Sequence, residues 1–147
     1  MGFVTSDVVA SNLVLIIPNA SLYHFGVLTS IIHMAWMRAV CGRLEMRYRY
    51  SADIVYNNFP WPEPTDAQKA KIEQTAQAIL DVRAKYPNST LAALYSDKFM
   101  PTDLLHAHEK NDKAVMAAYG WKVNRDNQES MVVAKLFKLY QELTKNN

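Results

Sequence analysis

Apolar side chains recur every three or four residues over much of the second half of the chain, which is the spacing of a helix that buries one face. The spacing predicts helices over about 65–85, from 101–102 to just before Gly120, and over about 128–143. Thr65 and Gln68 have the spacing of a capping box at the start of the first helix. We therefore predict a helical C-terminal domain over residues 65–147.

The first half of the chain mixes strand-like and helical patterns. Residues 8–17 are rich in aliphatic and β-branched side chains and stop at Pro18, which predicts a strand followed by a turn. Residues 21–41 repeat apolar positions with helical spacing, and Gly42 follows where a C-terminal cap is expected. Residues 45–51 alternate strictly, which predicts a second strand. Prolines at 60, 62 and 64 predict an extended connector.

These patterns together predict an α+β fold that is predominantly helical. A small strand-containing part over residues 1–64 precedes a three-helix part over residues 65–147. Apolar residues follow the start of the chain at once, at Phe3 and Val4, whereas complete domains more often begin with a polar, frayed stretch. We therefore expect a fragment of a larger protein, with a short buried first strand as the alternative.

The composition excludes several classes of protein to which the chain could belong. Of the 147 residues, 50% are hydrophobic and 20% are charged, and the formal net charge is +2, so bulk charge does not argue for nucleic acid. Cys41 is the single cysteine, which excludes an internal disulfide framework and a cysteine zinc site. No apolar run approaches the roughly 18 residues of a membrane span. No signal peptide is recognisable, so we expect a cytoplasmic protein without a membrane partner.

The segment from Glu45 to Ser51 contains a Glu-x-Arg-x-Arg pattern. Because alternate residues of a strand face opposite ways, Glu45, Arg47 and Arg49 would share one face at intervals of about 7 Å. Arginine can bond guanine O6 and N7 together, and glutamate can accept from cytosine N4, so this row suits the DNA major groove. An exposed strand with an internal Glu–Arg ladder explains the same pattern. The residues alone leave both interpretations open.

Longer motifs within residues 9–62 resemble a known family. They are the stretches Tyr23 to Leu28, His33 to Leu44, Arg49 to Ser51 and Val55 to Pro62. With them the chain resembles the C-terminal region of the MmeI-like family, which comprises single-chain type IIG restriction–modification enzymes and their methyltransferase-only relatives. The similarity continues through the helical part to about Gly120.

The resemblance implies a parent protein with a Rossmann-like domain that transfers a methyl group from S-adenosylmethionine to adenine N6. A target-recognition domain and a helical region follow in that parent. By the resemblance, Glu45 and Arg47 cooperate on one base pair and Arg49 reads another. A further base-reading position lies on the preceding strand, near Leu13.

Two arginines flank the charged strand. Arg38 and Arg43 are candidates for contacts with the DNA backbone, and ordinary surface arginines are an equal alternative. Neither has a partner that the sequence can identify.

Catalytic and cofactor motifs are missing from the sequence. The glycines, at 2, 26, 42 and 120, form no glycine-rich turn for S-adenosylmethionine, and no Asn/Asp-Pro-Pro-aromatic motif occurs. His106 and His108 are two residues apart, whereas a helical metal site uses a spacing of three or four. We therefore expect no catalytic residue, cofactor or metal in this chain, and S-adenosylmethionine only in the parent.

The sequence thus predicts recognition of specific double-stranded DNA sequences on behalf of a larger adenine-N6 methyltransferase. Its partners would be DNA and the methyltransferase domain of the parent polypeptide. A helical protein-interaction or assembly module of the same system is the alternative from another class. A separate small specificity subunit is a third possibility.

Overall fold

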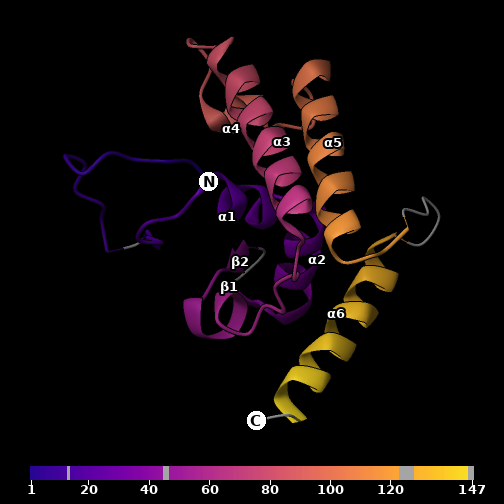
Figure 1. Cartoon of the computed structure of the whole chain (residues 1–147). Coiled ribbons are helices and arrows are strands. Elements are labelled where there is room, and N and C mark those ends of the chain that lie inside the picture. The colour runs from indigo at the N-terminus through magenta and orange to yellow at the C-terminus, as the bar shows by residue number, and fades with distance from the viewer. Residues whose placement is uncertain (13, 45–46, 123–127, 146–147) are drawn as a thin grey trace.

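The computed structural model describes residues 1–12, 14–44, 47–122 and 128–145, and it describes the strand residues 42–44 and 47–49 through their backbone. The elements are α1 (Leu22–Leu28), α2 (Ile31–Val40), β1 (Gly42–Leu44), β2 (Arg47–Arg49), the π-helical turn η1 (Ala52–Tyr56), α3 (Asp66–Ala84), α4 (Leu91–Leu94), α5 (Thr102–Ala118) and α6 (Gln128–Lys145) (Figure 1). The described chain is therefore predominantly helical, as predicted.

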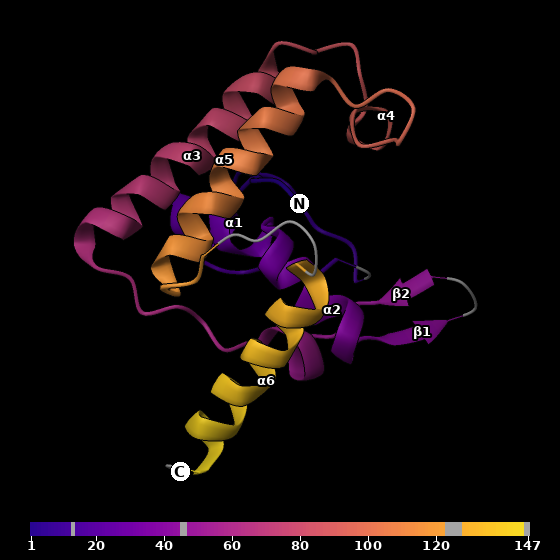
Figure 2. The ribbon, with the colours of Figure 1, turned by 90° about the vertical axis from the view of Figure 1, so that its right-hand side faces the viewer.

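Helices α3 and α5 form the longest packed pair of the molecule and lie side by side (Figures 1 and 2). Ile72 and Ile79 of α3 and Leu104 and Val115 of α5 are fully buried. The predicted capping box is present at the start of α3, where the Thr65 side chain accepts from the backbone of Gln68 and the Gln68 side chain accepts from the backbone of Thr65. These helices confirm the spacing argument for this part of the chain.

Gly26 allows α1 to pack tightly across α3. A Cβ at this position would lie 2.6 Å from Cγ2 of Ile72 and 3.2 Å from Cβ of Ala76. Asn111 of α5 stabilises the same crossing, because its Nδ2 donates to the Gly26 carbonyl oxygen over 2.7 Å and its Oδ1 accepts from Oγ1 of Thr75 over 3.0 Å. This buried amide joins α1, α3 and α5.

Helix α6 packs against α2 and extends away from α3 and α5 (Figure 2). The ring of Trp36 in α2 lies 5.2 Å from that of Phe137 and 5.9 Å from that of Tyr140. Arg38 and Glu129 join the same two helices through paired hydrogen bonds, of 2.7 Å from Nε to Oε1 and 3.1 Å from Nη2 to Oε2. Aromatic packing and one bidentate ion pair therefore hold α6 in place.

The prediction of one continuous helix over residues 21–41 is wrong. The chain leaves the helix at Thr29 and Ser30 and starts again at Ile31, with Ser30 as the N-cap of α2. Asp112 of α5 supports the new start, since its Oδ1 accepts the Ile31 backbone N–H over 2.9 Å. A carboxylate from another helix favours this break, and local apolar spacing does not reveal such a contact.

The predicted strand over residues 8–17 is also wrong: the described residues of this stretch form no strand, and Leu13 lies outside the described residues. The backbone hydrogen bonds at this stretch close local turns, from Val8 N to Thr5 O and from Val14 N to Ser11 O. β-Branched composition favours an extended backbone, but a strand also needs a neighbouring strand to pair with. The described part of this chain supplies none here.

β Structure in the described residues is limited to the antiparallel pair β1 and β2. The strand-containing part is therefore much smaller than predicted, and helices with irregular chain make up most of residues 1–64. Gly42 belongs to β1, and Cys41 ends α2 with its backbone N–H bonded to Met37 O over 2.8 Å. Gly42 is therefore not the helix cap that the sequence suggested.

The proline connector between the two halves forms neither helix nor strand. Tyr119 of α5 donates its hydroxyl to the Pro60 carbonyl over 2.7 Å, and Tyr23 of α1 donates to the Pro62 carbonyl over 3.3 Å. Two tyrosines thus attach the connector to the helical body. Within the described chain, no helix has the length and apolar character that crossing a membrane would require.

Candidate nucleic-acid interface

The charged motif predicted from the sequence lies on the β1–β2 hairpin. The Cα of Arg47 pairs with that of Leu44, the Cα of Arg49 with that of Gly42, and the Cα of Arg43 with that of Tyr48. Positions two apart in a strand share a face, so this register keeps positions 47 and 49 together and position 43 on the other side. Glu45 lies outside the described residues.

A buried histidine anchors the end of the second strand. Nε2 of His33 in α2 lies 2.9 Å from the hydroxyl of Tyr50, the residue that follows β2. His33 is 1% exposed, and burial lowers its pKa to about 4, so its imidazole is neutral at physiological pH. Burial likewise raises the pKa of Tyr50 to about 12. This neutral pair joins the hairpin to the hydrophobic core.

The chain after the hairpin is attached to the same helix. Trp36 of α2 donates its indole N–H to the Val55 carbonyl over 3.0 Å, and Val55 is fully buried within η1. Phe59 packs edge-on against His33, with ring centroids 4.6 Å apart. Both ends of the hairpin therefore meet α2, since β1 begins directly after this helix and η1 returns to it.

The hairpin extends from the end of α2 away from α3 and α5 (Figure 2). A free hairpin of three-residue strands is marginal in water. Here its base is fixed by aromatic side chains that pack in the core, since Tyr50 meets His33 and Phe59 packs against the same histidine. The arrangement presents a short charged ribbon from a rigid support.

Arg38 and Arg43 occupy different environments. Arg38 pairs with Glu129 of α6, and 31% of the Arg38 side chain is exposed. Arg43 is a residue of β1, opposite Tyr48. The structure thus gives Arg38 a partner within the protein and places Arg43 in the hairpin itself.

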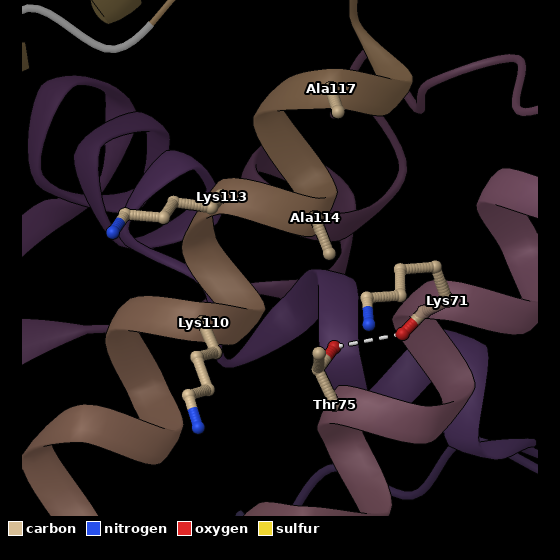
Figure 3. Close-up of a pocket in the computed structure, with 6 residues that line it drawn as sticks. All are labelled: Lys71, Thr75, Lys110, Lys113, Ala114 and Ala117. Atoms are coloured by element: carbon tan, nitrogen blue, oxygen red, sulfur yellow. Dashed lines mark hydrogen bonds between the residues drawn. The ribbon is translucent and has the colours of Figure 1, made fainter.

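A second cationic feature lies between α3 and α5, in a shallow groove of about 370 Å³ (Figure 3). Its lysines, Lys71, Lys110 and Lys113, surround small side chains that include Ala114 and Ala117. Figure 3 shows these lysines in front of the N-terminal helices, so the groove is on the face of α3 and α5 that α1 does not cover. Figure 2 places this helix pair and the hairpin on opposite sides of the molecule.

The anchoring role of His33 and Tyr50 was not predicted from the sequence. The alternation over 45–51 does put Tyr50 on the face opposite the charged row, and the helical spacing does put His33 near apolar positions. Neither pattern identifies the two side chains as partners. Among the described residues, no group of three or more His, Cys, Asp or Glu side chains is arranged to hold a metal ion.

The described chain is thus a helical body from which a short hairpin with Arg43, Arg47 and Arg49 extends. Comparison with protein families assigns this architecture: residues 1–63 match the model of the MmeI target recognition domain, and residues 64–146 match that of the MmeI C-terminal domain. The chain belongs to the MmeI family.

Relatives of known name support the same assignment. The chain is 44% identical over 144 residues to DNA methyltransferase A of Bacillus subtilis (strain 168), which covers 98% of this chain and 16% of that protein. A solved structure of the type IIL restriction–modification enzyme MmeI in complex with DNA is 52% identical, with a TM-score of 0.83, over 87% of this chain and 17% of that one. The chain therefore spans about a sixth of the length of these relatives.

Proposed function

We propose that this chain recognises a specific sequence in double-stranded DNA on behalf of a larger S-adenosylmethionine-dependent adenine-N6 methyltransferase or type IIG restriction–modification enzyme. The observation that carries the proposal is the charged hairpin held at its base by α2. The family assignment and the MmeI–DNA complex among its relatives support it. In the proposal, the methyltransferase domain and its cofactor belong to the rest of the parent polypeptide, and the protein acts in the cytoplasm.

The hairpin is an antiparallel two-stranded ribbon, and the major groove, which is about 12 Å wide, admits an element of this kind. In our proposal Glu45 and Arg47 read one base pair, with arginine donating to guanine and glutamate accepting from cytosine. Arg49 reads a second base pair. Planar guanidinium groups favour this role, because each can present two parallel donors to one base edge.

The remaining candidate residues have supporting roles in the proposal. Leu13 lies near a further base contact, on a segment that precedes the hairpin. Arg43, which is part of the hairpin, contacts a phosphate of the DNA backbone. Arg38 would have to share its guanidinium between a phosphate and Glu129, so we assign it the weaker phosphate contact.

The test uses a chimera, in which this chain replaces the matching segment of DNA methyltransferase A. We expect Arg49→Ala to relax the methylated sequence at one base pair, with a loss of discrimination of about 1–3 kcal/mol. Glu45→Lys should change the preference at another base pair. Methylated positions can be mapped in plasmid DNA by a sequencing method that detects N6-methyladenine.

Arg43→Ala is the matched control within the same hairpin. It should weaken binding about equally at all sequences and reduce the salt dependence by about one phosphate contact. If Arg49→Ala and Glu45→Lys leave every methylated position unchanged in an active chimera, base reading by this hairpin is refuted. Unchanged positions together with a failure of the chimera to assemble would instead favour the helical interaction module.

A further inference from the structure

The lysine groove between α3 and α5 has no role in the proposed contacts with DNA. Lys71, Lys110 and Lys113 are exposed at its rim. Nζ of Lys71 donates to Oε1 of Gln74 over 3.1 Å, and within the described residues none of the three lysines forms an ion pair with a carboxylate. Neighbouring ammonium groups without an acidic partner favour the binding of a negatively charged surface.

The acidic residues of α5 that flank these lysines in the sequence do not pair with them. Asp112 is directed to the start of α2, where its Oδ1 accepts the Ile31 backbone N–H over 2.9 Å. Glu109 precedes Lys113 by one helical turn, a spacing that permits an ion pair, but these two described residues form none. A partner can therefore engage the lysines without first breaking an ion pair within the described chain.

Small side chains form the floor of the groove. Thr75 of α3 and Ala114 of α5 are 6% and 8% exposed, and Ala117 is exposed one turn further along α5. Figure 3 shows Ala114 between Lys71 of α3 and the two lysines of α5. Small residues at a contact allow two helix axes to approach to about 8 Å. The groove therefore suits a helix whose apolar ridge contacts the alanines and whose flanks meet the lysines.

We propose that this groove binds an amphipathic helix, with acidic residues on both flanks of its apolar face, from the part of the relatives' polypeptide that this chain does not contain. Helix α1 already packs on one face of the α3–α5 pair, so the docked helix would complete a helical bundle around the pair. The proposal rests on the proposed function only in placing the DNA at the hairpin.

Three observations favour this occupant over DNA. The chain covers 16% of one relative and 17% of the other, so most of their polypeptide is available as the source of the helix. The hairpin and the α3–α5 pair lie on opposite sides of the molecule (Figure 2). The alanine floor stabilises an apolar helix ridge, whereas phosphate groups gain nothing from apolar contact.

Lysine acetylation, read by mass spectrometry, tests the proposal in the isolated chain and in the chimera. In the isolated chain the three groove lysines should react as fast as Lys98, an exposed lysine outside the groove. In the chimera they should react about 10-fold more slowly or slower still, because the groove is then unoccupied for about a tenth of the time or less. Lys98 should react equally in both proteins. Equal rates at the groove lysines in both proteins would overturn the proposal.

Charge reversal makes the test specific. Lys110→Glu combined with Lys113→Glu should restore fast acetylation of Lys71 in the chimera, because the acidic flank is then repelled. Lys98→Glu combined with Lys145→Glu makes the same change in net charge at exposed sites outside the groove and should preserve the slow reaction. The urea midpoint of the isolated chain shows that each variant folds. Slow acetylation of Lys71 in both double variants would contradict the assigned charge pairing and overturn the proposal.

A steric substitution tests the shape of the groove separately from its charge. Ala117→Trp places a large ring on the exposed part of the floor and should restore fast acetylation of Lys71 in the chimera. Ala84→Trp, at an exposed position at the end of α3, is the control and should have no effect. Unchanged slow acetylation in Ala117→Trp would show that nothing lies on the floor and would overturn docking of a helix.

A second experiment applies if the chimera does not fold. The chain can be co-expressed with DNA methyltransferase A that lacks the matching segment. Co-purification of the two that is lost in the variant with Lys110→Glu and Lys113→Glu would support the proposal. Failure of the wild-type chain to co-purify, or co-purification that this double variant leaves unchanged, would overturn it.

The remaining outcomes separate this proposal from other occupants and from the proposed function. Slower acetylation of the groove lysines when duplex DNA is added to the isolated chain would assign the groove to phosphate and overturn the proposal. Slower acetylation only at high protein concentration, with a dimer in light scattering, would assign it to a second copy and also overturn it. Slow acetylation in a chimera whose methylated positions are unchanged by Arg49→Ala and Glu45→Lys would support helix docking while refuting base reading.

Discussion

The α3–α5 pair and the β1–β2 hairpin are stabilised in different ways. Helices α3 and α5 bury apolar side chains along their length and add the amide of Asn111 at the crossing with α1. The hairpin has three residues in each strand and is attached at its base, where Tyr50 meets His33. The contrast indicates that most of the folding free energy and the proposed base contacts reside in separate parts of the chain.

This separation has a consequence for specificity. The described contacts of the hairpin are made at its base, where Tyr50 meets His33, whereas substitutions at the crossing points of the helical body remove buried contacts. The body still influences the hairpin, because α2 contributes to the core and also supports the hairpin base. Substitutions in the two regions should therefore have separable effects on stability and on recognition.

The largest expected effect is in the helical body. Ile72→Ala removes a fully buried side chain at the crossing of α1 and α3 and should lower the free energy of unfolding by about 2–5 kcal/mol. Urea unfolding of the isolated chain measures the loss. Leu91→Ala, at a half-exposed site in α4, is the control and should change it by less than about 0.5 kcal/mol. Equal losses of unfolding free energy in both variants would contradict the conclusion that the buried α3–α5 pair provides most of the folding free energy.

An intermediate effect should come from Asp112, the carboxylate at the start of α2. Burial raises its pKa to about 6, so the folded state binds more protons than the unfolded state between pH 4 and 6, and its contribution to stability falls as pH rises through this window. Asp112→Asn keeps an acceptor for Ile31 N–H and removes the buried charge. It should raise stability at pH 7.5 by up to about 3 kcal/mol.

The pH dependence sharpens this prediction. Burial lowers the pKa values of His33 and His108 to about 4, so their contributions to stability are lost as pH falls from 6.5 to 4. They oppose Asp112 in the wild-type chain, and Asp112→Asn should therefore give a steeper rise of stability with pH. Urea unfolding at several pH values measures the slope, and Asp97→Asn is the exposed control. A slope unchanged by Asp112→Asn would refute this account.

The smallest expected effect is at the hairpin base. Tyr50→Phe removes the hydroxyl that pairs with His33, leaves its buried imidazole without that partner, and should lower stability by about 1 kcal/mol. Tyr86→Phe is the matched control, since it removes a hydroxyl bond of 2.9 Å to Asp103, far from the hairpin.

The two tyrosine variants should differ in DNA recognition. In the chimera, Tyr50→Phe should reduce the preference for the methylated site over other DNA, because the hairpin is less firmly positioned. Tyr86→Phe should leave that preference unchanged. The ratio of affinities for site and non-site DNA at fixed salt is the measurement, and an identical ratio in both variants would remove the proposed positioning role.

Much of the helical body was predictable because its signals are local. The capping box at Thr65 and Gln68 and the apolar spacing of α3, α5 and α6 lie within single elements. The break before Ile31 was not predictable, since the carboxylate that supports it comes from Asp112, 81 positions away. The strand over 8–17 was predicted from composition, but the described chain supplies no partner with which it could pair.

The proposed site shows the same division. The charged residues at 45, 47 and 49 stand together in the sequence, so alternation alone was enough to predict that they share one face, while their proposed base-reading role came from the resemblance. The supports of the hairpin, His33 with Tyr50 and Trp36 with Val55, are 17 and 19 positions apart. No short-range pattern connects them, and their roles emerged only from the packed structure.

Local periodicity in the amino-acid order was thus sufficient to determine where the long helices form and which charged residues occupy one short ribbon, because backbone hydrogen bonding and side-chain spacing act over a few residues. Tertiary packing decided where α2 begins, how closely α1 approaches α3 and what holds the hairpin base. These features depend on burial and on hydrogen bonds between distant residues, whose free energy is gained only when the whole chain is folded.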